Sequence, residues 1–196
     1  MVQTAFWDEV LAEEVTWQAV VLIPKEKKDY WGIGLVEVVW KVVAAILNCR
    51  FASSITYHDA LHGFRAGRGT GTATLEAKLL QQISAMREEV LYVIFLDLTK
   101  AYDNLDSSRC LEILEGYGVG PNSRRLLTNH WRLLTMVDRS GGYYGTEFIG
   151  ERGVTQGDPL SPTIFNVVVD AVIRHWVKRI VEEAEARGET GQEGRH

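Results

Sequence analysis

The sequence contains little cysteine and less basic than acidic charge. Its two cysteines, Cys49 and Cys110, are far apart and have no CxxC partner, so neither a disulfide framework nor a cysteine-rich zinc site is indicated. We therefore expect an intracellular, reducing environment. The 21 basic residues are outnumbered by 26 acidic ones, and a net charge of −5 is the wrong sign for a surface that attracts a polyanion everywhere. Any contact with nucleic acid must be local.

The sequence also lacks a long apolar run, a secretory signal and an internal repeat. Residues 35–47 form the longest apolar stretch, but Glu37 and Lys41 interrupt it, and it is too short to cross a bilayer. The acidic amino terminus has neither the basic start nor the apolar block of a secretory signal. Because 46% of the residues are hydrophobic, there is enough apolar surface for a packed core, and we expect a globular protein without membrane contact.

The spacing of apolar residues predicts an α+β fold. Amphipathic periodicity, capping residues and Pro121 at a favoured first-turn position predict helices over residues 35–54, 73–87, 107–115, 121–137 and 160–187. Ser107 is the expected cap of the third helix. A short strand at 20–23, a glycine-rich loop over 62–72 and a hairpin turn at 140–142 complete the pattern.

Residues 90–98, VLYVIFLDL, are a nearly continuous run of β-branched and aromatic residues, which predicts a strand buried on both faces. Asp97 breaks this run near its end, and a buried carboxylate needs a partner, water or a cation. Two interpretations are open: an Asx turn with the following amides, or a ligand of a divalent metal such as Mg²⁺. Asp103 and Asp106 are assigned local roles, as a turn ligand and as a negative charge at a helix N-terminus.

Residues 152–165, RGVTQGDPLSPTIF, combine a strand end, a turn and the start of a helix. Gly157 permits a close backbone approach or a positive φ angle, and Gln156 offers an amide that both donates and accepts hydrogen bonds. An ordinary loop into a helix explains the same residues, with Asp158 before Pro159 as a cap. This segment alone therefore identifies no function.

Four segments taken together resemble the reverse transcriptases. Residues 95–106, FLDLTKAYDNLD, and residues 152–172, RGVTQGDPLSPTIFNVVVDAV, resemble the first and second palm motifs of that family. Residues 22–35 and 62–70 resemble its finger segments, and order and spacing agree over about residues 20–176. The pattern most resembles the group II intron and non-LTR retroelement branch. It implies a fingers-like helical region over residues 1–90, a partial palm with an antiparallel sheet that carries Asp97 over residues 91–187, and a flexible tail over residues 188–196.

The resemblance implies a chemistry and a set of ligands. In this family a primer 3′ hydroxyl attacks a nucleotide α-phosphate, and two Mg²⁺ ions stabilise the attacking and leaving oxygens. Asp97 would be the catalytic metal-binding carboxylate, with the Leu98 carbonyl as a second metal ligand. Tyr102 would lie under the sugar and exclude a 2′-hydroxyl, with a core tyrosine as the alternative. Gln156 and Gly157 would line the nucleotide pocket. The implied ligands are an RNA template, a DNA primer and deoxynucleoside triphosphates.

Cations in the finger segments are candidate phosphate ligands. The resemblance places Lys27 and Lys28 near the nucleotide, and Arg65 and Arg68 near the template backbone. Such contacts position a nucleic acid without reading its sequence. For each of these residues, a solvated surface charge remains the alternative.

Two features depart from the family pattern. Trp31 occupies the position of an arginine that clamps the triphosphate, and an indole has no charge and a single N–H. The 196 residues also contain no aromatic-x-Asp-Asp hairpin, which supplies the other metal-binding carboxylates, and no thumb. We therefore expect a sequence truncated before that motif, inactive in polymerisation by itself, whose partner would be the missing palm and thumb segment.

Two non-enzymatic interpretations stay open. The first is a module that binds RNA or an RNA–DNA hybrid through its A-form shape. The second is a decayed retroelement remnant, in which exposed palm surfaces favour aggregation. Salt-dependent binding of a hybrid without nucleotide incorporation would favour the module, whereas a longer reading frame with a Tyr/Phe-x-Asp-Asp hairpin would favour the enzyme.

Overall fold

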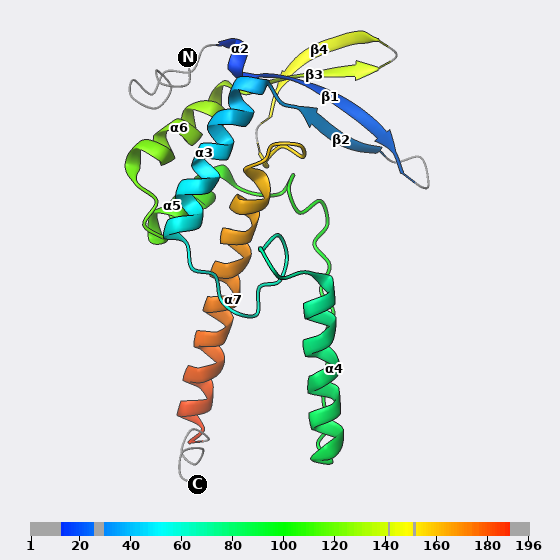
Figure 1. The fold of residues 1–196 in the computed structure, drawn as a ribbon, viewed down its shortest axis with the longest axis vertical. Coiled ribbons are helices and arrows are strands. Elements are labelled where there is room, and N and C mark those ends of the chain that lie inside the picture. Colours follow the sequence, from blue (N-terminus) through cyan, green and yellow to red (C-terminus); the bar gives the residue numbers. More distant parts are fainter. Residues whose placement is uncertain (1–12, 26–29, 141, 151, 189–196) are drawn as a thin grey trace. The chain divides into compact units, whose positions relative to one another are not determined.

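A computed structural model describes residues 13–25, 30–140, 142–150 and 152–188. The chain divides into two compact units that alternate along the sequence. The first unit combines the residues up to Thr56 with Val93–Phe165, and the second combines Tyr57–Tyr92 with the residues from Asn166 onward. Helices and one sheet make up the structure, so the expected α+β class is confirmed (Figure 1). The functional division into a fingers-like region and a partial palm stays a prediction.

The sheet belongs to the first unit and has four strands in the order β2-β1-β3-β4. Its strands are β1 (Trp17–Pro24), β2 (Tyr30–Leu35), β3 (Thr135–Ser140) and β4 (Tyr143–Ile149). β1–β2 and β3–β4 are antiparallel hairpins, and β1 and β3 join them in parallel, with Ala19 opposite Val137 (Figure 1). The sheet is therefore mixed and not purely antiparallel.

The parallel pairing has a simple local cause. The short helix α2 (Glu13–Thr16) precedes β1, and α6 (Pro121–Leu133) precedes β3. These two helices contact each other, so both strands start from the same end of the sheet and run in the same direction. The predicted end of this helix at Val137 is wrong for the same reason. α6 ends at Leu133, because Thr135 already pairs with Trp17 in the sheet.

Three helices form the core of the first unit: α3 (Val38–Ser54), α5 (Ser107–Gly116) and α6. The apolar side chains that they bury are Trp40, Val43, Ala44, Leu47, Phe51, Cys110, Leu114, Leu126 and Leu127. Pro121 is the first residue of α6, as predicted. α5 is capped by Asp106 and not by Ser107, because the Asp106 carboxylate accepts the Arg109 N–H at 3.0 Å.

The prediction of a buried strand over residues 90–98 is wrong. These residues form neither helix nor strand, and their apolar side chains face solvent, with Tyr92 87% and Phe95 93% exposed. A strand needs a hydrogen-bonding neighbour. β2 and β4 are the edge strands of the sheet, and within the described residues neither of them pairs with residues 90–98. Asp97 is therefore not carried on a sheet.

The second unit contains α4 (Thr70–Met86) and most of α7 (Ser161–Ala186), a continuous helix whose first turn belongs to the first unit. Both helices confirm predicted ones. Within the second unit, the Asn166 side chain donates to the Gly63 carbonyl at 2.8 Å, and Asp170 forms an ion pair with Arg174 at 2.7 Å. Among the described residues, no helix is both long enough and apolar enough to span a membrane.

Candidate functional site

A cleft of about 840 Å³ lies in the first unit. Its walls come from the β1–β2 hairpin, residues 100–111, the end of α6 and residues 148–156. Tyr102 and Gln156, which the resemblance to reverse transcriptases places at the nucleotide pocket, both line this cleft. Because these residues are far apart in the sequence, their meeting in one cleft is a property of the fold.

Three backbone hydrogen bonds join the segments around this cleft. The N–H groups of Gly153 and Val154 donate to the carbonyls of Leu105 and Tyr102, at 2.8 Å and 3.1 Å. On the other side of the same loop, the Gly34 N–H donates to the Gln156 carbonyl at 2.6 Å. One finger segment and both palm-like segments are thus connected through a single loop, residues 152–158.

Glycine is required at two positions of this loop. Gly153 has φ +89°, and a Cβ there would lie 2.9 Å from the Asp103 Cα. Gly157 has φ +112°, and its Cβ would lie 2.3 Å from the Gly34 carbonyl oxygen. Both the backbone conformation and the close approach exclude a side chain. The predicted reason for Gly157, close approach with positive φ, is confirmed.

Cations and aromatic rings give the cleft its chemical character. The cations that line it are Lys25, Lys100, Arg132 and Arg152, and the aromatic residues include Trp31, Tyr102, Trp131 and Phe148. The Lys25 ammonium lies 5.1 Å from the centre of the Trp31 ring, within the range of a cation–π interaction. A chain that is acidic overall therefore has a local surface suited to phosphates and bases.

A family model described as reverse transcriptase (RNA-dependent DNA polymerase) matches residues 23–189. The chain belongs to the reverse transcriptase family. It is 29% identical over 173 residues to a retrovirus-related Pol polyprotein from the type-2 retrotransposable element R2DM of Drosophila melanogaster. The matched region covers 86% of this chain and 16% of that relative. Similar Pol polyproteins from type-1 element R2 are 30% identical in Popillia japonica and 32% identical in Nasonia vitripennis, covering 80% and 79% of this chain. The chain spans only 23% and 16% of those two relatives.

Because the chain belongs to the reverse transcriptase family, the surroundings of the Tyr102 side chain bear on its implied role beside the nucleotide sugar. Its ring packs 5.3 Å from the Phe165 ring at the start of α7, and burial raises the pKa of the Tyr102 hydroxyl above its ordinary value. The hydroxyl is therefore neutral at physiological pH. The side chain is both packed and exposed to the cleft, so the core and cleft alternatives for this tyrosine are not exclusive.

The metal ligands expected in a reverse transcriptase are not assembled in the described residues. Asp97 and Leu98 are exposed in the segment without regular structure and do not line the cleft. Asp103 lines it, whereas Asp106 caps α5, in agreement with its predicted local role. Within the described residues, no three histidine, cysteine or acidic side chains converge. These residues therefore do not fit a two-metal site by themselves, and the assignment of Asp97 and Leu98 to Mg²⁺ stays a prediction.

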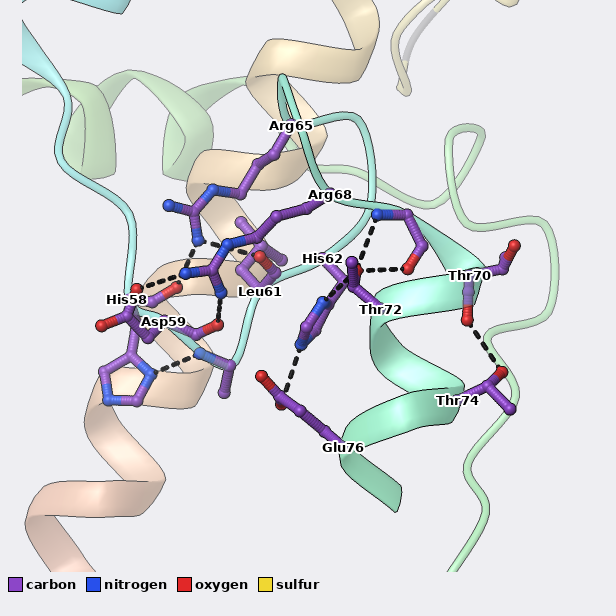
Figure 2. Close-up of polar contacts among 12 residues, drawn as sticks. His58, Asp59, Leu61, His62, Arg65, Arg68, Thr70, Thr72, Thr74 and Glu76 are labelled. Atoms are coloured by element: carbon purple, nitrogen blue, oxygen red, sulfur yellow. Dashed lines mark hydrogen bonds and ion pairs between the residues drawn. The ribbon is translucent and has the colours of Figure 1, made fainter. Parts of the chain in front are cut away.

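Arg65 and Arg68 make structural contacts within the second unit. Figure 2 shows both guanidinium groups directed at the loop that starts at His58. Arg65 Nη1 donates to the carbonyls of His58 and Leu61, at 2.8 Å and 2.9 Å. Arg68 pairs with the Asp59 carboxylate at 2.7 Å and also donates to the Asp59 carbonyl. These arginines hold the finger loop in shape, and their contact with template stays a prediction.

His62 of the same loop also makes structural contacts. Thr72 and Glu76 of α4 hold the His62 ring, through contacts at 2.8 Å to Nδ1 and 3.0 Å to Nε2 (Figure 2). The start of α4 is thereby tied to the loop that precedes it. Lys27 and Lys28, the other predicted phosphate ligands, lie outside the described residues.

Sequence reasoning missed part of the cleft. Lys100 and Arg152 lie inside the two palm-like segments, and their positions next to the motif residues could have identified them. Trp131 and Phe148 belong to no recognised segment, and only the pairing of β3 with β1 brings the end of α6 and β4 to the cleft. Trp131 and Phe148 could therefore be assigned to the cleft only from the fold.

Proposed function

We propose that this chain provides the fingers and the front of the palm of an RNA-directed DNA polymerase. The reaction would transfer a nucleotide from a deoxynucleoside triphosphate to the 3′ end of a DNA primer on an RNA template. The observation that carries the proposal is the loop of residues 152–158, which is hydrogen-bonded to Gly34 on one side and to residues 102–105 on the other. Tyr102 and Gln156 thereby share one basic, aromatic cleft.

Each part of the cleft has a proposed task. Tyr102 would lie under the sugar of the incoming nucleotide, and Gln156 would contact the template base or the nucleotide. Lys100 and Arg152 would neutralise phosphates, because cationic side chains supply most of the affinity for a nucleic-acid backbone. Lys25, held near the Trp31 ring, adds a charge on the side where the family arginine is replaced.

The proposed metal chemistry needs groups that this sequence does not contain. Mg²⁺ would supply charge stabilisation at the reacting phosphate, and Asp97 would be one of its ligands. The 196 residues contain no adjacent pair of aspartates, and the described residues hold no cluster of three ligands. We therefore propose that the 196-residue polypeptide does not incorporate nucleotides by itself.

Two measurements on the 196-residue chain test this function. Fluorescence anisotropy with a labelled RNA–DNA hybrid should show binding that weakens steeply as salt increases. Arg152→Ala should reduce that affinity and the salt dependence, because Arg152 lines the cleft, whereas Arg109→Ala should not, because Arg109 pairs with Glu112 at 2.7 Å outside it. Primer extension with Mg²⁺ should give no product. Absence of hybrid binding would contradict the proposed function, and incorporation abolished by Asp97→Ala would contradict the proposed inactivity.

A non-catalytic hybrid-binding module is the second candidate. It is favoured by the combination of four cations in the cleft with no converging ligand set in the described residues. The nucleotide sequence downstream of codon 196 separates the two. An in-frame Tyr/Phe-x-Asp-Asp hairpin supports the polymerase, and its absence supports the module.

A further inference from the structure

Asp158 lies two residues after Gln156, which lines the cleft, but is itself directed into the core, and Gly157 between them does not line the cleft. Only 7% of the Asp158 surface is exposed. One carboxylate oxygen accepts the Leu160 N–H at 2.9 Å, which is the local cap that the sequence predicts. The other accepts the indole N–H of Trp40 in α3 at 2.8 Å. A buried carboxylate is costly unless such donors reach it, so its position depends on them.

Trp40 is rigidly held as a donor. Its side chain is fully buried, and its ring stacks on His130 of α6 with the centroids 3.4 Å apart and the planes 7° apart. Neither ring can turn without disturbing the contact between α3 and α6. The indole N–H therefore points to a fixed place, and the carboxylate must come to it.

The chain from Gly34 into α3 holds the last part of the loop at two residues, Gln156 and Asp158. Gly34 binds the Gln156 carbonyl through its N–H, and Trp40, six residues later, binds the Asp158 side chain. Asn48, further along α3, donates to the Pro159 carbonyl at 2.9 Å. Only Gly157 lies between Gln156 and Asp158, so a displacement of Asp158 must also displace Gln156.

We infer that Trp40 is a positioning residue for the cleft: its hydrogen bond to Asp158 sets the place of Gln156, and thereby the recognition of the template next to the primer end. This inference rests on the proposed function, because it names what the Trp40 contact does for that site. Trp40 touches no ligand. It acts through Asp158 and the loop.

The test compares two labelled RNA–DNA hybrids that differ only at one end. One has a single-stranded RNA template overhang beyond the DNA 3′ end, and the other is blunt. The measured quantity is the dissociation constant of the blunt hybrid divided by that of the overhang hybrid, for the 196-residue chain. A lower ratio means a weaker preference for the overhang. Loss of stability alone would weaken both complexes equally, whereas misplacement of Gln156 changes the ratio.

The chain is expected to prefer the overhang, and Gln156→Ala to reduce this preference. Trp40→Phe keeps the aromatic stacking and removes the N–H, so it should reduce the preference about three- to tenfold, the range of one lost hydrogen bond. Trp40→Phe combined with Gln156→Ala should be no worse than Gln156→Ala alone. Asp158→Asn replaces one of the two accepting oxygens with an NH₂ group, which cannot accept from Trp40 or from Leu160, so it should also reduce the preference.

Trp17→Phe is the matched control. Trp17 also donates its indole N–H to a carboxylate, that of Glu147 at 3.3 Å, but it does not line the cleft. It should leave the ratio unchanged. Should Trp40→Phe fail to fold, Asn48→Ala releases the same turn at Pro159 and should lower the ratio in the same direction.

The outcomes separate the two proposals. If the wild-type chain binds neither hybrid, the proposed function fails, and this inference fails with it. If the chain binds both hybrids with equal affinity, the inference is overturned while hybrid binding stands. It is also overturned if Gln156→Ala lowers the ratio but folded Trp40→Phe, or in its place Asn48→Ala, leaves it at the wild-type value.

Discussion

Two segments that overlap the palm-like motifs, residues 152–158 and residues 90–98, have opposite structural environments. Residues 152–158 are hydrogen-bonded to one finger segment, to residues 102–105 and to the core helix α3. Residues 90–98 are richer in apolar side chains, yet they form no regular structure and expose Phe95 almost completely. The difference shows that apolar sequence predicts burial only where the chain also supplies a partner. A loop of small and polar residues is fixed because its partners lie within the first unit.

The largest expected effect is on the fixed side of this comparison. Trp40→Ala should lower the free energy of unfolding by about 3–5 kcal/mol, because it leaves a cavity beside His130 and removes a donor from a buried carboxylate. Urea denaturation followed by near-UV circular dichroism measures it. Trp176→Ala, at a side chain that is 57% exposed on α7, should change the value by no more than about 0.5 kcal/mol. Equal losses for the two variants would contradict the burial of Trp40.

Gly157→Ala should have the next largest effect. The backbone at φ +112° and the approach of the Gly34 oxygen both oppose a Cβ, which predicts a loss of about 1–3 kcal/mol. Thermal unfolding measures this loss. Gly63→Ala is the matched control, because a Cβ there meets no atom within 4 Å. If Gly157→Ala were as stable as Gly63→Ala, the close contact between the loop and β2 would be absent in solution.

Asp158 gives a smaller effect that depends on pH. Burial raises the pKa of its carboxyl, although the hydrogen bonds from Leu160 and Trp40 oppose this shift. The native state therefore holds this proton more tightly than the unfolded chain, and stability from this group is lost as pH rises from about 4 through the native pKa. Asp158→Asn carries no such proton, so its unfolding temperature should fall less than that of wild type between pH 4 and pH 8. Parallel curves for the two proteins would contradict a buried carboxyl at this position.

The sequence predicted most helices because their evidence is local. Periodicity and Pro121 placed α3, α4, α7 and the start of α6 within a few residues. The end of α6 was missed because apolar residues continue at helical spacing, and only pairing with β1 breaks the helix there. β2 was missed because YWGIGL contains two glycines, which the antiparallel partner β1 nevertheless accommodates.

The candidate site was predictable only where chemistry follows from a motif. Tyr102 and Gln156 line the cleft, as the family resemblance implied. Arg65 matched a motif equally well, but its guanidinium is directed to the carbonyls of its own loop, which no linear pattern reveals. The partnership of Trp40 with Asp158 joins residues 118 positions apart and could be found only in the fold.

The smallest expected effect is on the exposed side, and it is the sharpest test of the comparison. Phe95→Ala should change the free energy of unfolding by no more than about 0.5 kcal/mol, because its side chain is 93% exposed and leaves no cavity. Phe51→Ala removes the same side chain from the α3 core, where it is 2% exposed, and should cost about 3–5 kcal/mol. Phe95→Ala should also lower light scattering from concentrated solutions, because it reduces an exposed apolar segment. A loss for Phe95→Ala comparable with that for Phe51→Ala would mean that residues 90–98 find a strand partner in solution, and the difference between the two segments would then disappear.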